Sequence, residues 1–161
     1  MSHQSAPAIL ALCLVLCSVT MLAQAPLPYG APVSLEIAKK AAAAAAAEAH
    51  KNNWTMAIAV VDPSGTLVYY EKMDNTQNGS AKVAIDKART AALFKRPSKV
   101  FQDRLASGNA QGILKLEGAL PIEGGIPLVV DGHIVGAIGV SGDTSDHDGQ
   151  CAQMGVEALG K

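Results

Sequence analysis

Three side chains of different chemistry recur at helical spacing near the middle of the chain. Lys87, Thr90 and Phe94 lie three and four residues apart within SAKVAIDKARTAALFK, residues 80–95. On a helix they form one strip that offers a cation, a hydroxyl group and an aromatic ring beside a face of small residues. Such a strip could hold a flat anionic ligand. The same spacing is also typical of the solvated edge of an amphipathic helix, and the sequence leaves both interpretations open.

Basic residues gather around this strip. Between residues 82 and 104 the chain carries seven Lys and Arg, Arg96 among them, against two Asp, although its formal net charge is -1. A small ligand with carboxylates or phosphates, such as an anionic metabolite, would be attracted there. The excess could equally balance the aspartates at 143, 146 and 148. The near-neutral total argues against nucleic acid as a partner, because neutralising phosphates needs a clear basic excess.

A double glycine follows an acidic residue at Glu123-Gly124-Gly125. Phosphate-binding loops of the dinucleotide or Walker type place their glycines between a strand and a helix. Here the glycines come before a predicted strand and no helix follows, so such a loop is excluded. We expect the glycines to let the main chain pass close to a ligand or a neighbouring subunit, with Glu123 as an acceptor.

His147 and Cys151 lie four residues apart in the last predicted helix, which places both on one face. A structural zinc site needs about four ligands, and only His50 and His133 lie elsewhere beyond the apolar N-terminus, so zinc is poorly supported. An axial bond to haem iron needs a single residue, which makes His147 a candidate haem-iron ligand. The alternative for Cys151 is an ordinary core position. The chain lacks GxSxG and HExxH motifs, so catalytic residues stay unknown and enzymatic activity stays undecided.

Periodicity and turn chemistry predict an α+β fold. The turn sequences Asp62-Pro63-Ser64-Gly65 and Asp131-Gly132 each separate two β-type segments, which predicts two hairpins. Ser34 is expected to cap the first helix, and Ser145 with Asp148 resembles a capping box for the last one. Hairpins separated by helices give an antiparallel sheet with helices on its faces. The predicted helices are residues 35–52, 80–95, 98–106 and 145–159, and the predicted strands are 55–61, 66–71, 120–122, 126–130 and 133–140.

The N-terminus differs in kind from the rest. Residues 1–26 contain no Asp, Glu, Lys or Arg, and the apolar run is too short for a typical membrane-spanning helix. Ala23-Gln24-Ala25 has the small residues of a peptidase site, so residues 1–25 are a predicted signal peptide cleaved after Ala25. An uncleaved membrane anchor is the alternative. We expect residues 26–33 to form an extended leader, residues 34–161 to form the domain, and the product to be secreted or periplasmic, without a membrane association after cleavage.

Three motifs together carry a family resemblance. The segments AIAVVDPSG, KARTAALFKRPS and EGGIPLVVDGHIVGAIGVSGDTSDHDGQCAQMG are similar to the GlcG/HbpS-like family of small haem-binding proteins, which is related to the C-terminal domain of PduO-type corrinoid adenosyltransferases. The similarity covers nearly all of residues 32–161. Its most specific part is GGIPLVVDGHIVGAIGVSG.

The resemblance implies a profilin-like fold with a central antiparallel sheet of about five strands, and assembly as a homo-oligomer. It also implies binding of haem or a related tetrapyrrole, with haem sensing, storage or slow degradation proposed for relatives. By this resemblance Lys87, Thr90 and Phe94 lie where a ligand could bind, and Glu123-Gly124-Gly125 lies opposite them.

Three functions remain as hypotheses. In the first, an exported protein buries a tetrapyrrole ring against small residues and Phe94, while Lys87, Arg89 or Arg96 meets the propionates. In the second, an enzyme acts on a small carboxylate or aromatic metabolite in the same cleft, with Lys87 and Glu123 as acid and base. In the third, the chain is a structural or accessory subunit whose cleft is only a contact between subunits.

Overall fold

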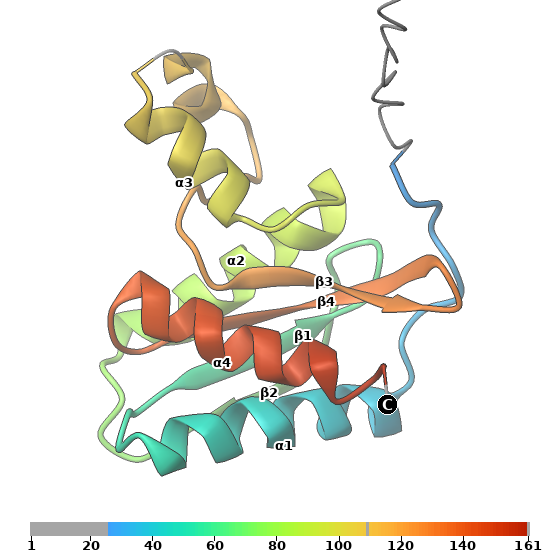
Figure 1. Cartoon of the computed structure of the whole chain (residues 1–161), viewed down its shortest axis with the longest axis vertical. Coiled ribbons are helices and arrows are strands. Elements are labelled where there is room, and N and C mark those ends of the chain that lie inside the picture. The colour runs from blue at the N-terminus through green and yellow to red at the C-terminus, as the bar shows by residue number, and fades with distance from the viewer. Residues whose placement is uncertain (1–25, 109, 161) are drawn as a thin grey trace, which may run out of the picture.

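The computed structural model describes residues 26–108 and 110–160 (Figure 1). The predicted signal peptide and its cleavage site lie outside the described residues. Within the described ranges, no helix is both long and apolar enough to cross a membrane. The elements are, in chain order, α1 (Leu35–Lys51), β1 (Ala57–Val61), β2 (Leu67–Lys72), α2 (Gly79–Phe94), α3 (Lys99–Ala106), the short 3-10 helix η1 (Gln111–Lys115), β3 (Gly125–Val130), β4 (His133–Ser141) and α4 (Ser145–Glu157).

The strands form a four-stranded antiparallel sheet in the order β2-β1-β4-β3. The α+β class is therefore confirmed, but the described sheet has one strand fewer than the expected five. Residues 120–122 are not a strand, because side chains of neighbouring elements bind their backbone. Thr90 Oγ1 accepts a hydrogen bond from the Leu120 amide at 2.7 Å, and Ser98 Oγ donates one to the Ile122 carbonyl at 2.6 Å.

Both predicted hairpins are confirmed. Asp131 and Gly132 have φ values of 49° and 75°, as a tight turn between β3 and β4 requires. In the turn between β1 and β2, Asp62 Oδ1 accepts hydrogen bonds from the Ser64 amide at 2.8 Å and the Thr66 amide at 3.0 Å. Local side-chain chemistry thus sets the antiparallel pairing of each strand pair.

Helices α1 and α4 cover one face of the sheet and contact each other, while α2 covers the other face (Figure 1). The alanine-rich α1 approaches α4 closely, since a Cβ built at Gly155 would lie 2.9 Å from the Ala41 carbonyl oxygen. On the other face, a Cβ at Gly139 in β4 would lie 2.1 Å from the Ala84 carbonyl oxygen of α2. Small residues therefore bring both helical layers to very short distances from their neighbours.

Helix caps agree with the prediction at one end of the chain and differ at the other. Ser34 Oγ accepts a hydrogen bond from the Ile37 amide at 3.2 Å, as expected for the N-cap of α1. The N-cap of α4 is Thr144 and not Ser145, with Thr144 Oγ1 accepting from the His147 amide at 3.4 Å. The predicted pairing of Ser145 with Asp148 is wrong: Asp148 is buried, its Oδ2 accepts from Lys87, and its Oδ1 accepts from the Asp143 amide before the cap at 3.3 Å.

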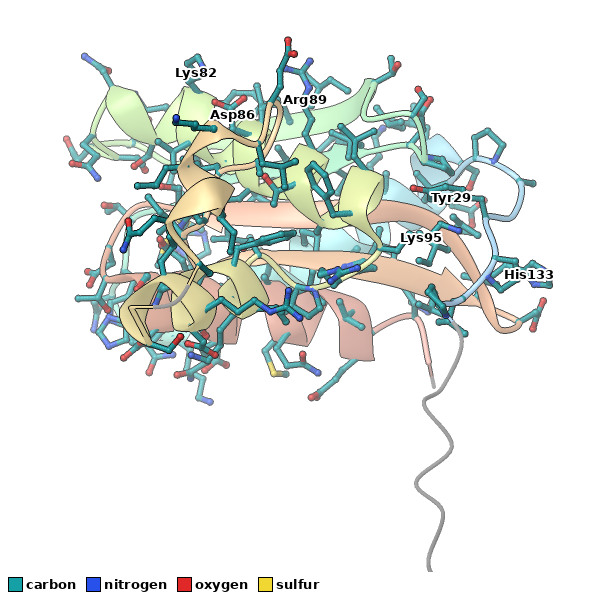
Figure 2. The ribbon with its side chains drawn as sticks, turned by 90° about the horizontal axis from the view of Figure 1, so that it is seen from above. Tyr29, Lys82, Asp86, Arg89, Lys95 and His133 are labelled. Atoms are coloured by element: carbon teal, nitrogen blue, oxygen red, sulfur yellow. The ribbon has the colours of Figure 1, made fainter. Side chains whose placement is uncertain are left out.

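The residues before α1 run along the start of β4. The Gly30 amide donates to the Ile134 carbonyl at 2.9 Å, and the Tyr29 hydroxyl donates to the Ala92 carbonyl at the end of α2 at 2.9 Å. The Lys95 ammonium lies 4.0 Å from the centre of the Tyr29 ring, and Figure 2 shows these two side chains next to each other. The segment is thereby attached to both β4 and the C-terminal end of α2.

Candidate functional site

The double-glycine turn packs directly on helix α2. A Cβ built at Gly125 would lie 2.1 Å from the Lys87 carbonyl oxygen, and one at Gly124 would lie 2.9 Å from Lys87 Nζ. Gly124 also has a φ of 124°, which side-chain-bearing residues rarely adopt. The two segments singled out in the sequence are thus adjacent. The space expected between them for a ligand is absent in this structure, because the backbones are in contact.

Lys87 forms a buried ion pair with a residue of α4. Its side chain is 1% exposed, that of Asp148 is 3% exposed, and Nζ lies 2.6 Å from Asp148 Oδ2. The Lys87 ammonium also donates to the Val140 carbonyl at 3.1 Å. Burial lowers the pKa of Lys87 and raises that of Asp148, while the attraction between the two charges opposes both shifts. Lys87 is therefore not at the surface to meet a propionate.

The other residues of the predicted strip make internal contacts. Thr90 is buried and its hydroxyl donates to the Asp86 carbonyl at 2.7 Å. Phe94 meets Phe101 of α3 edge to face, with ring centres 5.4 Å apart. Arg96 Nε donates to the Phe94 carbonyl at 2.9 Å. In this structure these side chains join α2 to α3 and to the loop before β3.

A cavity of about 430 Å³ lies on the other side of the double-glycine turn. Gly149 of α4 allows Glu123 to lie flat on that helix, since a Cβ there would be 2.5 Å from Glu123 Oε1. Of the predicted site residues, Glu123, Gly124 and Gly125 line this cavity. The full lining is Pro97, Lys99, Glu123, Gly124, Gly125, Ile126, Asp146, Gly149, Gln150 and Gln153.

Hydrogen bonds with residues at the start of α3 fix the double-glycine turn. Ser98, just before α3, accepts a hydrogen bond from the Gly125 amide at 2.9 Å through Oγ, and its own amide donates to the Gly125 carbonyl at 2.9 Å. Gln102 Oε1 accepts from the Glu123 amide at 2.8 Å. Lys99 Nζ lies 3.3 Å from Glu123 Oε2, and its hydrogen bond to Asp103 raises the pKa of Lys99, so its ammonium stays charged. The Glu123 carboxylate is therefore fixed at the cavity wall.

His147 lies apart from this cavity. Its Nδ1 is 2.8 Å from Asp143 Oδ1, and its ring stacks on Trp54 with centres 3.9 Å apart and planes 13° from parallel. A backbone hydrogen bond from Thr144 and then the contact with His147 lower the pKa of Asp143. A carboxylate on Nδ1 is the usual support of a metal-binding imidazole, because it leaves Nε2 for the metal. Trp54 did not emerge as a site residue from spacing, since it lies about ninety residues away in sequence.

Cys151 does not join His147 in a ligand pair. Its thiol is buried, and burial raises its pKa to about 12, so it is protonated at neutral pH. Among residues 26–108 and 110–160, no three His, Cys, Asp or Glu side chains are arranged to hold a metal ion. The described structure accordingly offers His147 as a single imidazole and not as part of a multidentate metal site.

Known proteins share both the sequence and this architecture. Residues 33–157 match the model of the family described as haem degrading protein HbpS-like. The chain is 39% identical over 109 residues to Protein GlcG of Escherichia coli strain K12, which covers 68% of this chain and 81% of that protein.

Two solved structures are similar over most of the chain. The crystal structure of HbpS has a TM-score of 0.76 at 34% identity and covers 84% of this chain and 95% of that one. The crystal structure of a PduOC:haem complex has a TM-score of 0.73 at 25% identity, covering 80% of this chain and 95% of that one. The sequence resemblance is confirmed, and the chain belongs to the HbpS-like family.

Proposed function

We propose that this protein is an exported member of its family that binds haem or a related tetrapyrrole, with His147 as the iron ligand. The PduOC:haem complex supports the ligand class, because that relative was crystallised with haem. The charge-free, apolar residues 1–25 support export. Sensing, storage and slow degradation of haem are all compatible with such a binder.

The arrangement of His147 is the observation that carries this proposal. Asp143 engages Nδ1, and Trp54 supports the ring from one face, so the imidazole is held in a defined orientation. Trp54 also lines an open cavity of about 610 Å³ together with His50 and Met73, and His147 contacts this cavity only through its stacking on Trp54. Bound iron would supply the redox chemistry that haem degradation requires, while His147 and the residues beside it would hold and orient the tetrapyrrole.

Titration with haemin tests the proposed ligand. We expect the wild-type protein to give a shifted Soret band, and His147→Ala to weaken haemin binding at least about tenfold, since supporting residues alone usually contribute that much to metal sites. His133→Ala is the matched control, because His133 is exposed and its Nδ1 contacts only the Asp131 carbonyl at 2.8 Å. A wild-type spectrum identical to that of free haemin would refute haem binding, and equal affinity of both variants would refute His147 as the ligand.

For the enzyme hypothesis, the structure leaves Glu123 at a cavity but removes Lys87 from it. Lys87 lies behind Gly124 in a buried ion pair, so it does not reach the cavity at the double-glycine turn. Glu123 lines that cavity. Because His147 does not line this cavity, a small-molecule site there is separate from the proposed haem site.

We propose in addition that the chain forms a homo-oligomer through the segment of α3 and η1, which stands away from the three-layered body (Figure 1). Leu114 and Leu116 at its end are exposed, which favours contact with a second apolar surface. We expect Leu114→Asp to lower the mass found by sedimentation equilibrium, and Lys115→Ala, between the two leucines, to leave it unchanged. A monomeric wild-type protein at micromolar concentration would refute self-association.

A further inference from the structure

We propose that the cavity at the double-glycine turn binds a small molecule through a primary ammonium group. This site is separate from His147, and its ligand has the opposite charge to the propionates of haem. Its walls are the Glu123 turn, the start of α3 and one face of α4. The inference rests on the geometry of the cavity, on the hydrogen-bonding groups that remain free in it, and on its charge.

The face of α4 that lines the cavity presents residues at helical spacing. Gly149, Gln150 and Gln153 follow Asp146 by three, four and seven residues. All four therefore lie on the same face of the helix and face the cavity. Gly149 is small enough for the Glu123 carboxylate to rest against the helix. With a volume of about 430 Å³, the cavity is within the size range of small-molecule sites.

The amide side chains in the cavity offer acceptors. Gln150 Nε2 donates to Glu48 Oε1 at 2.7 Å, and Gln153 Nε2 donates to Glu157 Oε1 at 3.2 Å. Because an ionised carboxylate only accepts hydrogen bonds, each of these contacts requires the amide nitrogen. The amide oxygens of Gln150 and Gln153 therefore remain as acceptors for a ligand that donates hydrogen bonds, and each amide nitrogen keeps one further N–H.

The carboxylates that line the cavity also favour a positively charged donor as the ligand. The Glu123 side chain is 17% exposed, and its Oε2 is buried without a hydrogen-bond partner among the described residues. Lys99 Nζ lies 3.3 Å from Glu123 Oε2 and donates to Asp103 at 2.9 Å, so this one ammonium group is shared between two carboxylates. The two negative charges of Glu123 and Asp146 exceed the single positive charge of Lys99 in the cavity lining. An ammonium group fits this site, since it carries positive charge and three donors.

The floor of the cavity is rigid. Behind Gly124 lies the buried Lys87–Asp148 pair, and Gly125 is bonded to Ser98 through both its amide and its carbonyl. A ligand would therefore enter a preformed site and would not need to order a loop, which favours measurable affinity for small compounds. The site also lies between α3 and α4, where a bound molecule would hold the two helices together.

Thermal unfolding with a matched set of four-carbon compounds tests this proposal. The probes are 1,4-diaminobutane, n-butylamine, 1-butanol and butyrate, each at millimolar concentration and constant ionic strength. We expect both amines to raise Tm by several degrees, the diamine more because Glu123 and Asp146 can each accept one ammonium group. Neither the alcohol nor the acid should raise Tm, since the alcohol lacks charge and butyrate would meet carboxylates.

Two variants locate the effect. Glu123→Gln keeps the shape of the side chain and should abolish most of the shift caused by n-butylamine. Asp74→Asn removes a carboxylate that lines the cavity beside Trp54, and should leave the shift unchanged. Nuclear magnetic resonance titration with n-butylamine provides a readout that does not depend on variant stability, with expected shifts at Gly124, Gly125 and Gly149. Equal stabilisation by amine, alcohol and acid, an unchanged effect in Glu123→Gln, or resonance shifts elsewhere would overturn the proposal.

Discussion

Replacing Lys87 by methionine should lower the free energy of unfolding by about 3–5 kcal/mol, the usual cost of removing one partner of a buried ion pair. The substitution leaves the Asp148 carboxylate, 3% exposed, without its counterion, and it removes the donor to the Val140 carbonyl. The pair also lies behind Gly124, so its loss should disturb the floor of the cavity. Urea denaturation at pH 7 measures this change.

Lys82 on the same helix provides the matched control. It pairs with Asp86, but its side chain is 83% exposed, and Figure 2 shows Lys82, Asp86 and Arg89 together along α2. Lys82→Met should change stability by no more than about 1 kcal/mol, as is usual for exposed ion pairs. In the double variant Lys87→Met/Asp148→Leu the loss should be smaller than the sum of the single losses, because no buried charge is left unpaired. Similar losses in Lys87→Met and Lys82→Met would contradict a stabilising role of the buried pair.

Gly139→Ala should destabilise the protein by about 3 kcal/mol or more, at or above the upper end of the range for overpacked cores. The added Cβ would lie 2.1 Å from the Ala84 carbonyl oxygen and 2.5 Å from the Ala88 amide nitrogen. Both are backbone atoms of α2, so relief requires that the whole helix move away from the sheet. Urea denaturation, with near-ultraviolet circular dichroism as a measure of packing, reports the effect.

Gly79→Ala separates close packing from the general effect of adding a methyl group. Gly79 begins α2 and a Cβ there meets nothing within 4 Å. This variant should be neutral or more stable by up to about 1 kcal/mol, because alanine loses less backbone entropy than glycine. If Gly139→Ala proved as stable as Gly79→Ala, the short distance between α2 and β4 would be incorrect.

The sequence predicted those features of the fold that depend on neighbouring residues. Ser34 caps α1 through the Ile37 amide three residues later, and Asp131-Gly132 adopts the two positive φ values of its hairpin. Helix boundaries agree within one or two residues for α1, α2 and α3. Family resemblance added what local patterns could not, namely that the double-glycine turn lies against α2.

The errors have one physical origin. Residues 120–122 are apolar and have strand-forming character, but Thr90 and Ser98 bind their backbone from α2 and from the start of α3. Asp148 has the spacing of a capping residue, but the Lys87 ammonium, 61 residues away, holds it in the interior. In each case a long-range partner decides the position of the segment or side chain, and local spacing contains no information about such a partner.

By itself, the sequence determined the α+β class, both hairpins and the family, while its choice of Glu123, Gly124, Gly125 and His147 as site residues stays a prediction. Only the tertiary structure decided that Lys87 is buried in an ion pair and that the cavity at the double-glycine turn lies on the α4 side of that turn. It also decided that Trp54 stacks on His147. The reason is that hydrogen bonds within a turn or a helix end involve adjacent residues. Burial, charge pairing and cavity shape depend instead on how distant elements pack together.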